Sequence, residues 1–254
     1  MPEFLLLPAK TRSWRLLDVF VILVLAMLII PLICVWAVKI GYQIRGIEVT
    51  LEQLQETTLL PALFLQELAL LWLTVASVRR GYGRPLAAIG INRVPPVRTI
   101  FSGLLWGAAL FWAQVMAEQI SFLFFSVFLG QEELTKVLTE ETQQITSLFG
   151  LGRDPLSLVL LILLFVVLVP LAEEVFFRGF AFQVFKERYG GRGAVFATAL
   201  LFTLMHGYVV EFLPIFAVGI GLGYITKHFQ SIWPGVIGHA LINLISVVTG
   251  VFFQ

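Results

Sequence analysis

The sequence is poor in cysteine, histidine and charge. Its single cysteine, Cys34, excludes an intrachain disulfide and a metal site built from cysteines. Charged residues make up only 13% of the chain and the net charge is +1, so we expect no nucleic-acid partner. Hydrophobic residues make up 59% and the mean hydropathy is +0.93, values far above those of a soluble domain. The chain therefore needs a lipid bilayer as its solvent.

Long apolar runs predict an all-α fold, a polytopic transmembrane helix bundle. Each crossing takes about 20 apolar residues. Basic residues precede the first run, but no small-residue cleavage site follows it, so we interpret it as a retained first span. We expect about seven spans, within a range of six to eight, at residues 17–38, 59–78, 99–129, 156–185, 194–208, 212–226 and 232–253.

Lysine and arginine are unevenly spread among the connections. They gather at the N-terminus (Lys10, Arg12), after the second span (Arg93) and after the fourth, whereas the intervening connections are acidic. The positive-inside rule then predicts a multi-pass protein of the plasma (inner) membrane, with the N-terminus in the cytoplasm and the C-terminus outside. We expect residues 130–155 to form an extracytoplasmic loop or a short surface helix.

The fourth span contains the adjacent acids Glu173 and Glu174, followed by Arg178. A charge inside the membrane is costly unless it is paired or faces water. The spacing of Glu174 and Arg178 predicts an ion pair on one helix face, and Glu173, turned about 100° away, should face a different partner. Pro170 should leave the carbonyl of Val166 unpaired and kink the helix. A solvated helix end at the membrane edge is the alternative interpretation.

Two later spans carry polar residues at helical spacing. Phe202 and His206 share one face, and His239 and Asn243 share another. Taken singly, each pair is also compatible with helix packing. Together with Glu173, these residues supply a carboxylate, two imidazoles and an amide, which are groups that activate water and stabilise an oxyanion.

These groups predict a peptidase mechanism. Glu173 takes a proton from a water that it holds together with His206. His239 and Asn243 donate hydrogen bonds to the developing oxyanion. The remaining charged residues of the fourth span, Glu174 and Arg178, fix that helix.

Three motifs in this order resemble the CAAX prenyl protease and bacteriocin-processing (CPBP, Abi) family of membrane peptidases. They are Glu-Glu-x-x-x-Arg at 173–178, Phe-x-x-x-His at 202–206 and His-x-x-x-Asn at 239–243. The resemblance implies a glutamate-type intramembrane endopeptidase with a cavity open towards the cytoplasm. It assigns catalysis to Glu173, His206, His239 and Asn243, with Glu174, Arg178 and Phe202 in support.

The resemblance also sets expectations about domains and metals. Residues 1–254 should form a single membrane domain, with N-terminal spans and an extracytoplasmic loop in 17–150 and a family-type catalytic core in 151–254. The sequence has no His-Glu-x-x-His helix. We expect no cofactor, and zinc held by Glu173, His206 and His239 is the alternative.

The predicted function is hydrolysis of a peptide bond near the C-terminus, or in the membrane-proximal part, of a protein or peptide. One alternative is a catalytically silent membrane scaffold or immunity protein that keeps the polar cluster for packing. Another is a proton-coupled transporter, because Glu67 and Glu118 are further carboxylates within spans. Hydrogen bonding between helices is the simpler explanation for those two residues.

Overall fold

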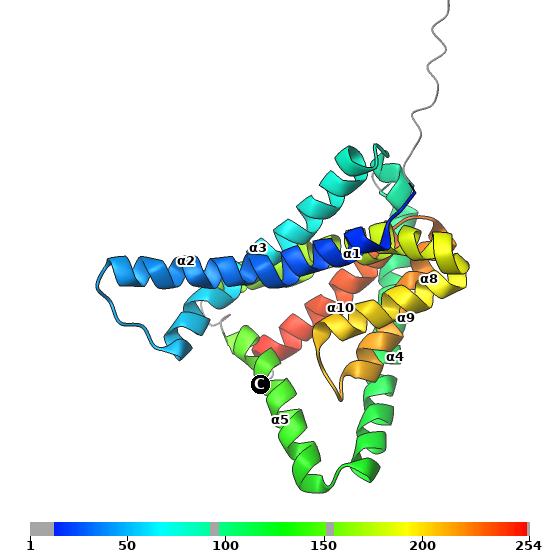
Figure 1. Ribbon diagram of the computed structural model, residues 1–254. Helices are drawn as coiled ribbons and strands as arrows, with labels where there is room; N and C mark the ends of the chain where they lie inside the picture. Colours follow the sequence, from blue (N-terminus) through cyan, green and yellow to red (C-terminus); the bar gives the residue numbers. More distant parts are fainter. Residues whose placement is uncertain (1–12, 92–96, 151–154, 253–254) are drawn as a thin grey trace, which may run out of the picture.

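The computed structural model describes residues 13–91, 97–150 and 155–252, and every regular element within them is a helix (Figure 1). The predicted all-α bundle is therefore confirmed. Three basic residues from the topology argument, Lys10, Arg12 and Arg93, lie outside the described residues.

The elements follow one another from the N-terminus as α-helices (α) and as π-helical or 3-10 segments (η). They are α1 (Leu16–Leu23), η1 (Val24–Ile29), α2 (Ile30–Ile44), α3 (Leu51–Ala76), η2 (Ser77–Gly81), η3 (Leu86–Ile89), α4 (Val97–Phe128), α5 (Gln131–Gly150), α6 (Pro155–Ile162), η5 (Leu163–Leu168), α7 (Val169–Glu173), η6 (Glu174–Ala181), α8 (Phe182–His206), α9 (Phe212–Phe229) and α10 (Trp233–Phe252).

Within the described residues, six helices are long and apolar enough to cross a membrane. One of them, Pro155–His206, covers the fourth predicted span and most of the fifth. Its backbone is broken at Gly190 (φ 68°, ψ 176°), between these two spans. A positive φ of this kind favours glycine. The expected loop after the fourth span was wrong: the helix continues through Lys186 and Arg188 up to this break. Lysine, arginine and glutamate are good helix formers in water, so the charged residues after position 185 did not indicate the end of the helix.

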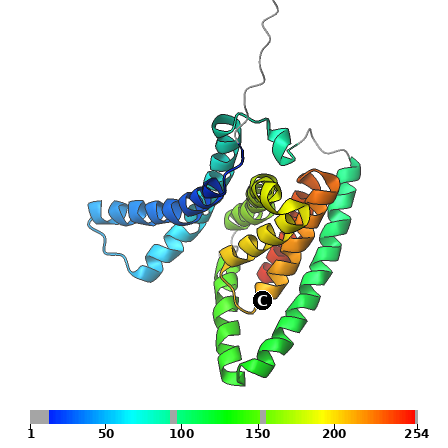
Figure 2. The same cartoon turned by 45° about the vertical axis from the view of Figure 1, so that its right-hand side comes forward.

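The N-terminal helices form an arm against the rest of the bundle. α2 packs along α3, and Figure 2 shows both reaching away from the other helices. α3 begins with a capping box in which Thr50 and Gln53 exchange hydrogen bonds. Further along, α3 packs against η5, α7 and η6, which belong to the helix that carries Glu173. The arm therefore supplies one wall of the polar cluster.

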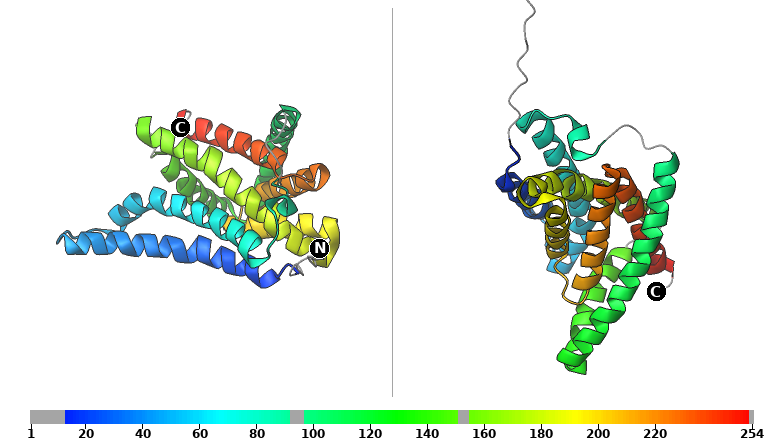
Figure 3. Two further views of the ribbon diagram at one scale, coloured as in Figure 1. Left: turned by 90° about the horizontal axis from the view of Figure 1, so that it is seen from above. Right: turned by 90° about the vertical axis from the view of Figure 1, so that its right-hand side faces the viewer.

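Close glycine contacts fix α10 against α4, which crosses α9 and α10 in Figure 3. A Cβ on Gly107 would lie 2.7 Å from the Cα of Gly238, and a Cβ on Gly103 would lie 2.7 Å from Ile237. Backbones at this separation leave no room for side chains between the helices. His239 directly follows this contact in the sequence, so the packing of α4 sets its position.

The segment expected to be a loop or a short surface helix is the 20-residue helix α5. Its Glu141 side chain is 8% exposed and binds the turn between α8 and α9. The Glu141 carboxylate accepts the backbone N–H groups of Val209, Val210 and Glu211. Ser121 of α4 donates to the carbonyl of Val210. Two helices thus hold the turn that follows His206.

Glu211 makes this turn sensitive to pH. Burial, followed by the charges of Glu118 and Glu141, raises the pKa of Glu211 from 4.5 to about 7. A raised carboxyl pKa means that the folded protein binds the proton more tightly, so stability is greatest below about pH 4.5 and falls as pH rises to about 7. Partial exposure limits this contribution to about 1–2 kcal/mol.

We therefore expect the melting temperature of the purified protein to decrease between pH 5 and pH 7.5. In Glu211→Gln this decrease should become smaller, because glutamine does not titrate. Glu56→Gln, at an exposed position of α3, is the control. An equal decrease in wild type and Glu211→Gln would contradict this assignment.

Candidate active site

A π-helical turn and Pro170 directly precede Glu173 and Glu174 in the helix and change its hydrogen bonding. In η5 the N–H of Val169 donates to the carbonyl of Leu164, five residues back. The same spacing would pair Pro170 with Phe165, but proline has no N–H. The Phe165 carbonyl instead accepts a hydrogen bond of 2.8 Å from Asn243 Nδ2 of α10. The π spacing thus matches Pro170 to the carbonyl of Phe165, one residue before the Val166 carbonyl that α-helical spacing indicates.

Glu174 and Arg178 form the ion pair that their spacing predicts. Arg178 Nη1 lies 3.0 Å from Glu174 Oε1, and both side chains are completely buried. Arg178 Nη2 also donates to the Gly219 carbonyl of α9 at 3.3 Å. The two residues lie in η6, a second π-helical segment, and such segments are frequent at functional sites. The solvated helix end is therefore excluded for this pair.

His239 lies between the two acids. Its Nδ1 is 3.3 Å from Glu174 Oε1, and its Nε2 is 3.7 Å from Glu173 Oε2. The partner of Glu173 is thus His239, different from the Arg178 that pairs with Glu174, as predicted, and the same imidazole also approaches Glu174. The same oxygen of Glu174 contacts both Arg178 and His239. Glu174 therefore joins the first motif to the third.

Phe202 joins the second motif to the others. Its ring centroid lies 4.6 Å from that of His206, 6.0 Å from that of His239, and 4.4 Å from the guanidinium carbon of Arg178. An arginine at this distance from an aromatic ring is stabilised by a cation–π interaction. Phe202 is 2% exposed, so it also forms an apolar wall beside the polar groups.

The hydrogen bond of His206 determines which ring nitrogen is available. His206 Nδ1 lies 2.8 Å from the Phe202 carbonyl. A carbonyl oxygen only accepts, so Nδ1 carries the proton, and Nε2 of the neutral ring is an acceptor. Within the described residues, Oε2 of Glu173 and of Glu174 are buried without hydrogen-bond partners. The site thus has two buried carboxylate oxygens from the first motif and an imidazole nitrogen of the half-buried His206 from the second as acceptors.

All seven residues predicted for the site lie in this region. Six of them are linked by the contacts above, from Glu173 through His239 and Phe202 to His206. Asn243 lies one turn beyond His239 on α10 and is held by Phe165. Among the described residues, no group of three His, Cys, Asp or Glu side chains is placed to hold a metal ion. The donor set suggested for zinc does not fit one in this arrangement.

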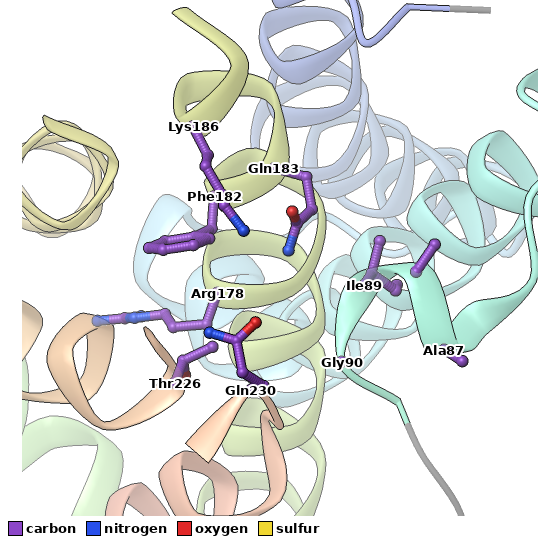
Figure 4. A pocket seen from close by; sticks show the side chains of 10 residues that line it. Ala87, Ile89, Gly90, Arg178, Phe182, Gln183, Lys186, Thr226 and Gln230 are labelled. Carbon is purple, nitrogen blue, oxygen red and sulfur yellow. The ribbon is translucent and has the colours of Figure 1, made fainter. Parts of the chain in front are cut away.

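A cavity of about 210 Å³ lies beside the buried ion pair. In Figure 4, Arg178 and Thr226 lie on one side of it and the segment from Ala87 to Gly90 on the other. Its wall is formed by Ala87, Ala88, Ile89, Gly90, Arg178, Phe182, Gln183, Lys186, Thr226 and Gln230. The cavity thus extends along the helix from Arg178 of the ion pair to Lys186.

Glu67 of α3 was not assigned to the site from the sequence. It is 2% exposed, and α3 packs against α7 and η6, which carry the two acids. Its position inside an apolar run was the available signal. That signal could not show which helix the side chain faces.

A helical bundle of membrane-spanning length that encloses carboxylates and imidazoles has the architecture of an intramembrane hydrolase. Residues 155–245 match the Rce1-like family, described as type II CAAX prenyl endopeptidase Rce1-like. This segment contains all three motifs, and its match to a family of CAAX-type membrane proteases confirms the resemblance found in the sequence. Comparison with curated proteins and with solved structures gave no match.

Proposed function

We propose that the protein is an intramembrane endopeptidase in which Glu173 and His206 activate water. The observation that carries the proposal is the position of His239 between Glu173 and Glu174, since it joins motifs from separate helices in one buried cluster. We propose that the scissile bond lies near the C-terminus, or in the membrane-proximal part, of a protein or peptide.

The steps of the proposed reaction follow from the atoms of Glu173 and His206 that can accept a hydrogen bond from water. Glu173 takes one proton of the water through its unpartnered Oε2, while Nε2 of His206 accepts a hydrogen bond from the other O–H. The water oxygen attacks the carbonyl carbon and forms a tetrahedral oxyanion. The C–N bond then breaks as the proton on Glu173 passes to the leaving amine, which restores the carboxylate.

His239 and Asn243 stabilise the oxyanion in this mechanism. Glu174 accepts from His239 Nδ1, which leaves Nε2 of a protonated ring to donate. The amide of Asn243 has two N–H groups, and the bond to Phe165 uses one of them. The second remains for the oxyanion. Arg178 supports this arrangement through Glu174, and Phe202 limits the access of bulk water.

We propose that this reaction uses no metal ion. Support comes from the lack of a three-ligand cluster in the described part of the chain. We further propose an inner-membrane orientation with the N-terminus in the cytoplasm and the C-terminus outside. The uneven distribution of lysine and arginine supports this orientation.

Protein termini in cell membranes provide the test. Membranes carrying the wild type are compared with membranes carrying Glu173→Ala, and Glu56→Ala serves as the matched control at an exposed glutamate. We expect new termini with the wild type and the control only, and we expect them to persist when a chelator is present. Identical termini in all membranes would instead support the scaffold. Loss on chelation alone would show that a metal takes part.

A further inference from the structure

Three successive backbone N–H groups in the turn between α8 and α9 converge on one carboxylate. Val209 and Val210 donate to Oε1 of Glu141, and Glu211 donates to Oε2. The donor–acceptor distance is 3.1 Å for Val210 and 3.3 Å for Glu211. Successive N–H groups of this kind form an anion-binding concavity in the backbone. The buried carboxylate of Glu141, which belongs to α5, fills this concavity.

The turn begins directly after His206, the last residue of α8. Gly207 follows in the left-handed region (φ 73°, ψ 10°), a conformation that ends helices. The His206 ring is tied to its own helix, because Nδ1 donates to the Phe202 carbonyl. Nε2 of His206 therefore moves together with the end of α8. The contacts that hold the turn also hold this end of the helix.

A second helix holds the same turn from its other side. The hydroxyl of Ser121, a buried residue of α4, donates to the carbonyl of Val210. Side chains of α4 and α5 thus bind both the C=O and the N–H of this one residue, and the turn lies between the two helices in Figures 1 and 2. Both Ser121 and Glu141 precede the segment 155–245 that matches the protease family.

Helix α4 connects this turn to the other imidazole of the site. Its Gly107 packs on the backbone of Gly238, which directly precedes His239 in α10. Its Ser121 binds the turn that directly follows His206. One helix is therefore in contact with both segments that carry the imidazoles. Glu141 of α5 completes the attachment of the turn to this frame.

We propose that Glu141 is a positioning residue for His206. This inference rests on the proposed function. The carboxylate acts through the turn: it keeps the end of α8 where Nε2 of His206 accepts a hydrogen bond from the water that Glu173 deprotonates. When the carboxylate is removed, three backbone N–H groups lose their acceptor. The turn then rearranges to satisfy them, because buried N–H groups need partners, and His206 is displaced.

Glu141→Ala tests this role through kcat and KM. The probe is a fluorescence-quenched peptide that ends in a farnesylated cysteine and three further residues. We expect kcat to fall about 10–100-fold, because a displacement of about 1 Å in a catalytic group can lower the rate about 100-fold. KM should change by less than about 3-fold, because His206 acts on water in the proposed mechanism. Glu140→Ala, at the exposed neighbouring position of α5, is the matched control and should have wild-type kinetics. A wild-type kcat in Glu141→Ala would overturn the proposal.

Two milder substitutions keep the test decisive if Glu141→Ala does not fold. Glu141→Gln retains one oxygen for the N–H groups of Val209 and Val210 but turns an NH₂ group towards that of Glu211. Its kcat should therefore lie below that of wild type and above that of Glu141→Ala. Ser121→Ala removes the contact from α4 and should also lower kcat without changing KM. Wild-type kcat in both Glu141→Gln and Ser121→Ala would contradict the proposed role.

NMR of the histidine rings tests the position of His206 without turnover. The chain has three histidines, so isotope-labelled histidine gives few ring signals, and single substitutions assign them. In Glu141→Ala the signals of His206 should shift or broaden, whereas those of His239 and of the exposed His228 should not. Unchanged His206 signals would overturn the positioning role, as would a change in all three rings, which indicates a general loss of structure. A wild type without Glu173-dependent cleavage would refute the proposed function, and the ring signals would still decide whether Glu141 positions His206.

Discussion

Glu173→Gln should reduce cleavage by about 10²–10⁴-fold, the usual contribution of a general base. Glutamine has the shape of glutamate but cannot take a proton from water. Folding should be preserved, because Glu173 Oε2 makes no hydrogen bond with the described residues and lies 3.7 Å from His239. The measurement is the rate of cleavage of a fluorescence-quenched peptide that ends in a farnesylated cysteine and three further residues, together with the melting temperature of the same preparation.

Two comparisons make this result specific. Glu56→Gln changes an exposed glutamate on the N-terminal arm and should leave the rate unchanged. A Glu173→Gln protein that retains more than about a tenth of wild-type activity would remove Glu173 from the role of general base. An inactive protein with a much lower melting temperature would make Glu173 a structural residue instead.

Breaking the buried ion pair should have the largest effect on stability. Arg178→Leu leaves the Glu174 carboxylate without its cation, and loss of one partner of a buried pair costs about 3–5 kcal/mol. Glu174→Gln should also lower stability, because it weakens contacts with Arg178 and His239 together. Unfolding monitored by fluorescence in detergent measures both changes.

The double variant Glu174→Leu/Arg178→Leu separates stability from function. Replacement of a whole buried pair by apolar residues is often neutral or stabilising, so the double variant should be more stable than Arg178→Leu alone. It should still lack activity, because His239 Nδ1 has lost the carboxylate that orients it. Single variants within about 1 kcal/mol of wild type would contradict the importance of the pair.

The sequence was informative where placing a residue in lipid has a large free-energy cost. Apolar runs predicted the helices, since a chain in lipid has to satisfy its backbone hydrogen bonds internally. The charged residues Glu173, Glu174 and Arg178 were conspicuous in the fourth span for the same reason, and the spacing of the last two predicted their ion pair.

Contacts between distant helices could not be predicted in this way. Helical spacing places Glu173 and Glu174 on different sides, but it does not reveal that His239 reaches both. The π spacing of η5 matches Pro170 to the carbonyl of Phe165 instead of that of Val166, and Asn243 of α10 donates to this carbonyl. The packing of α3, which carries Glu67, on α7 is likewise not recorded in any local pattern.

The glycine contact between α4 and α10 has a mechanical consequence. With the backbones at Gly107 and Gly238 touching, α10 cannot rotate about its own axis without driving side chains into α4. We therefore expect α4 and α10 to form a rigid wall that carries His239, and α9 packs on both. We therefore expect α4, α10 and His239 to keep their relative positions when a peptide reaches Glu173.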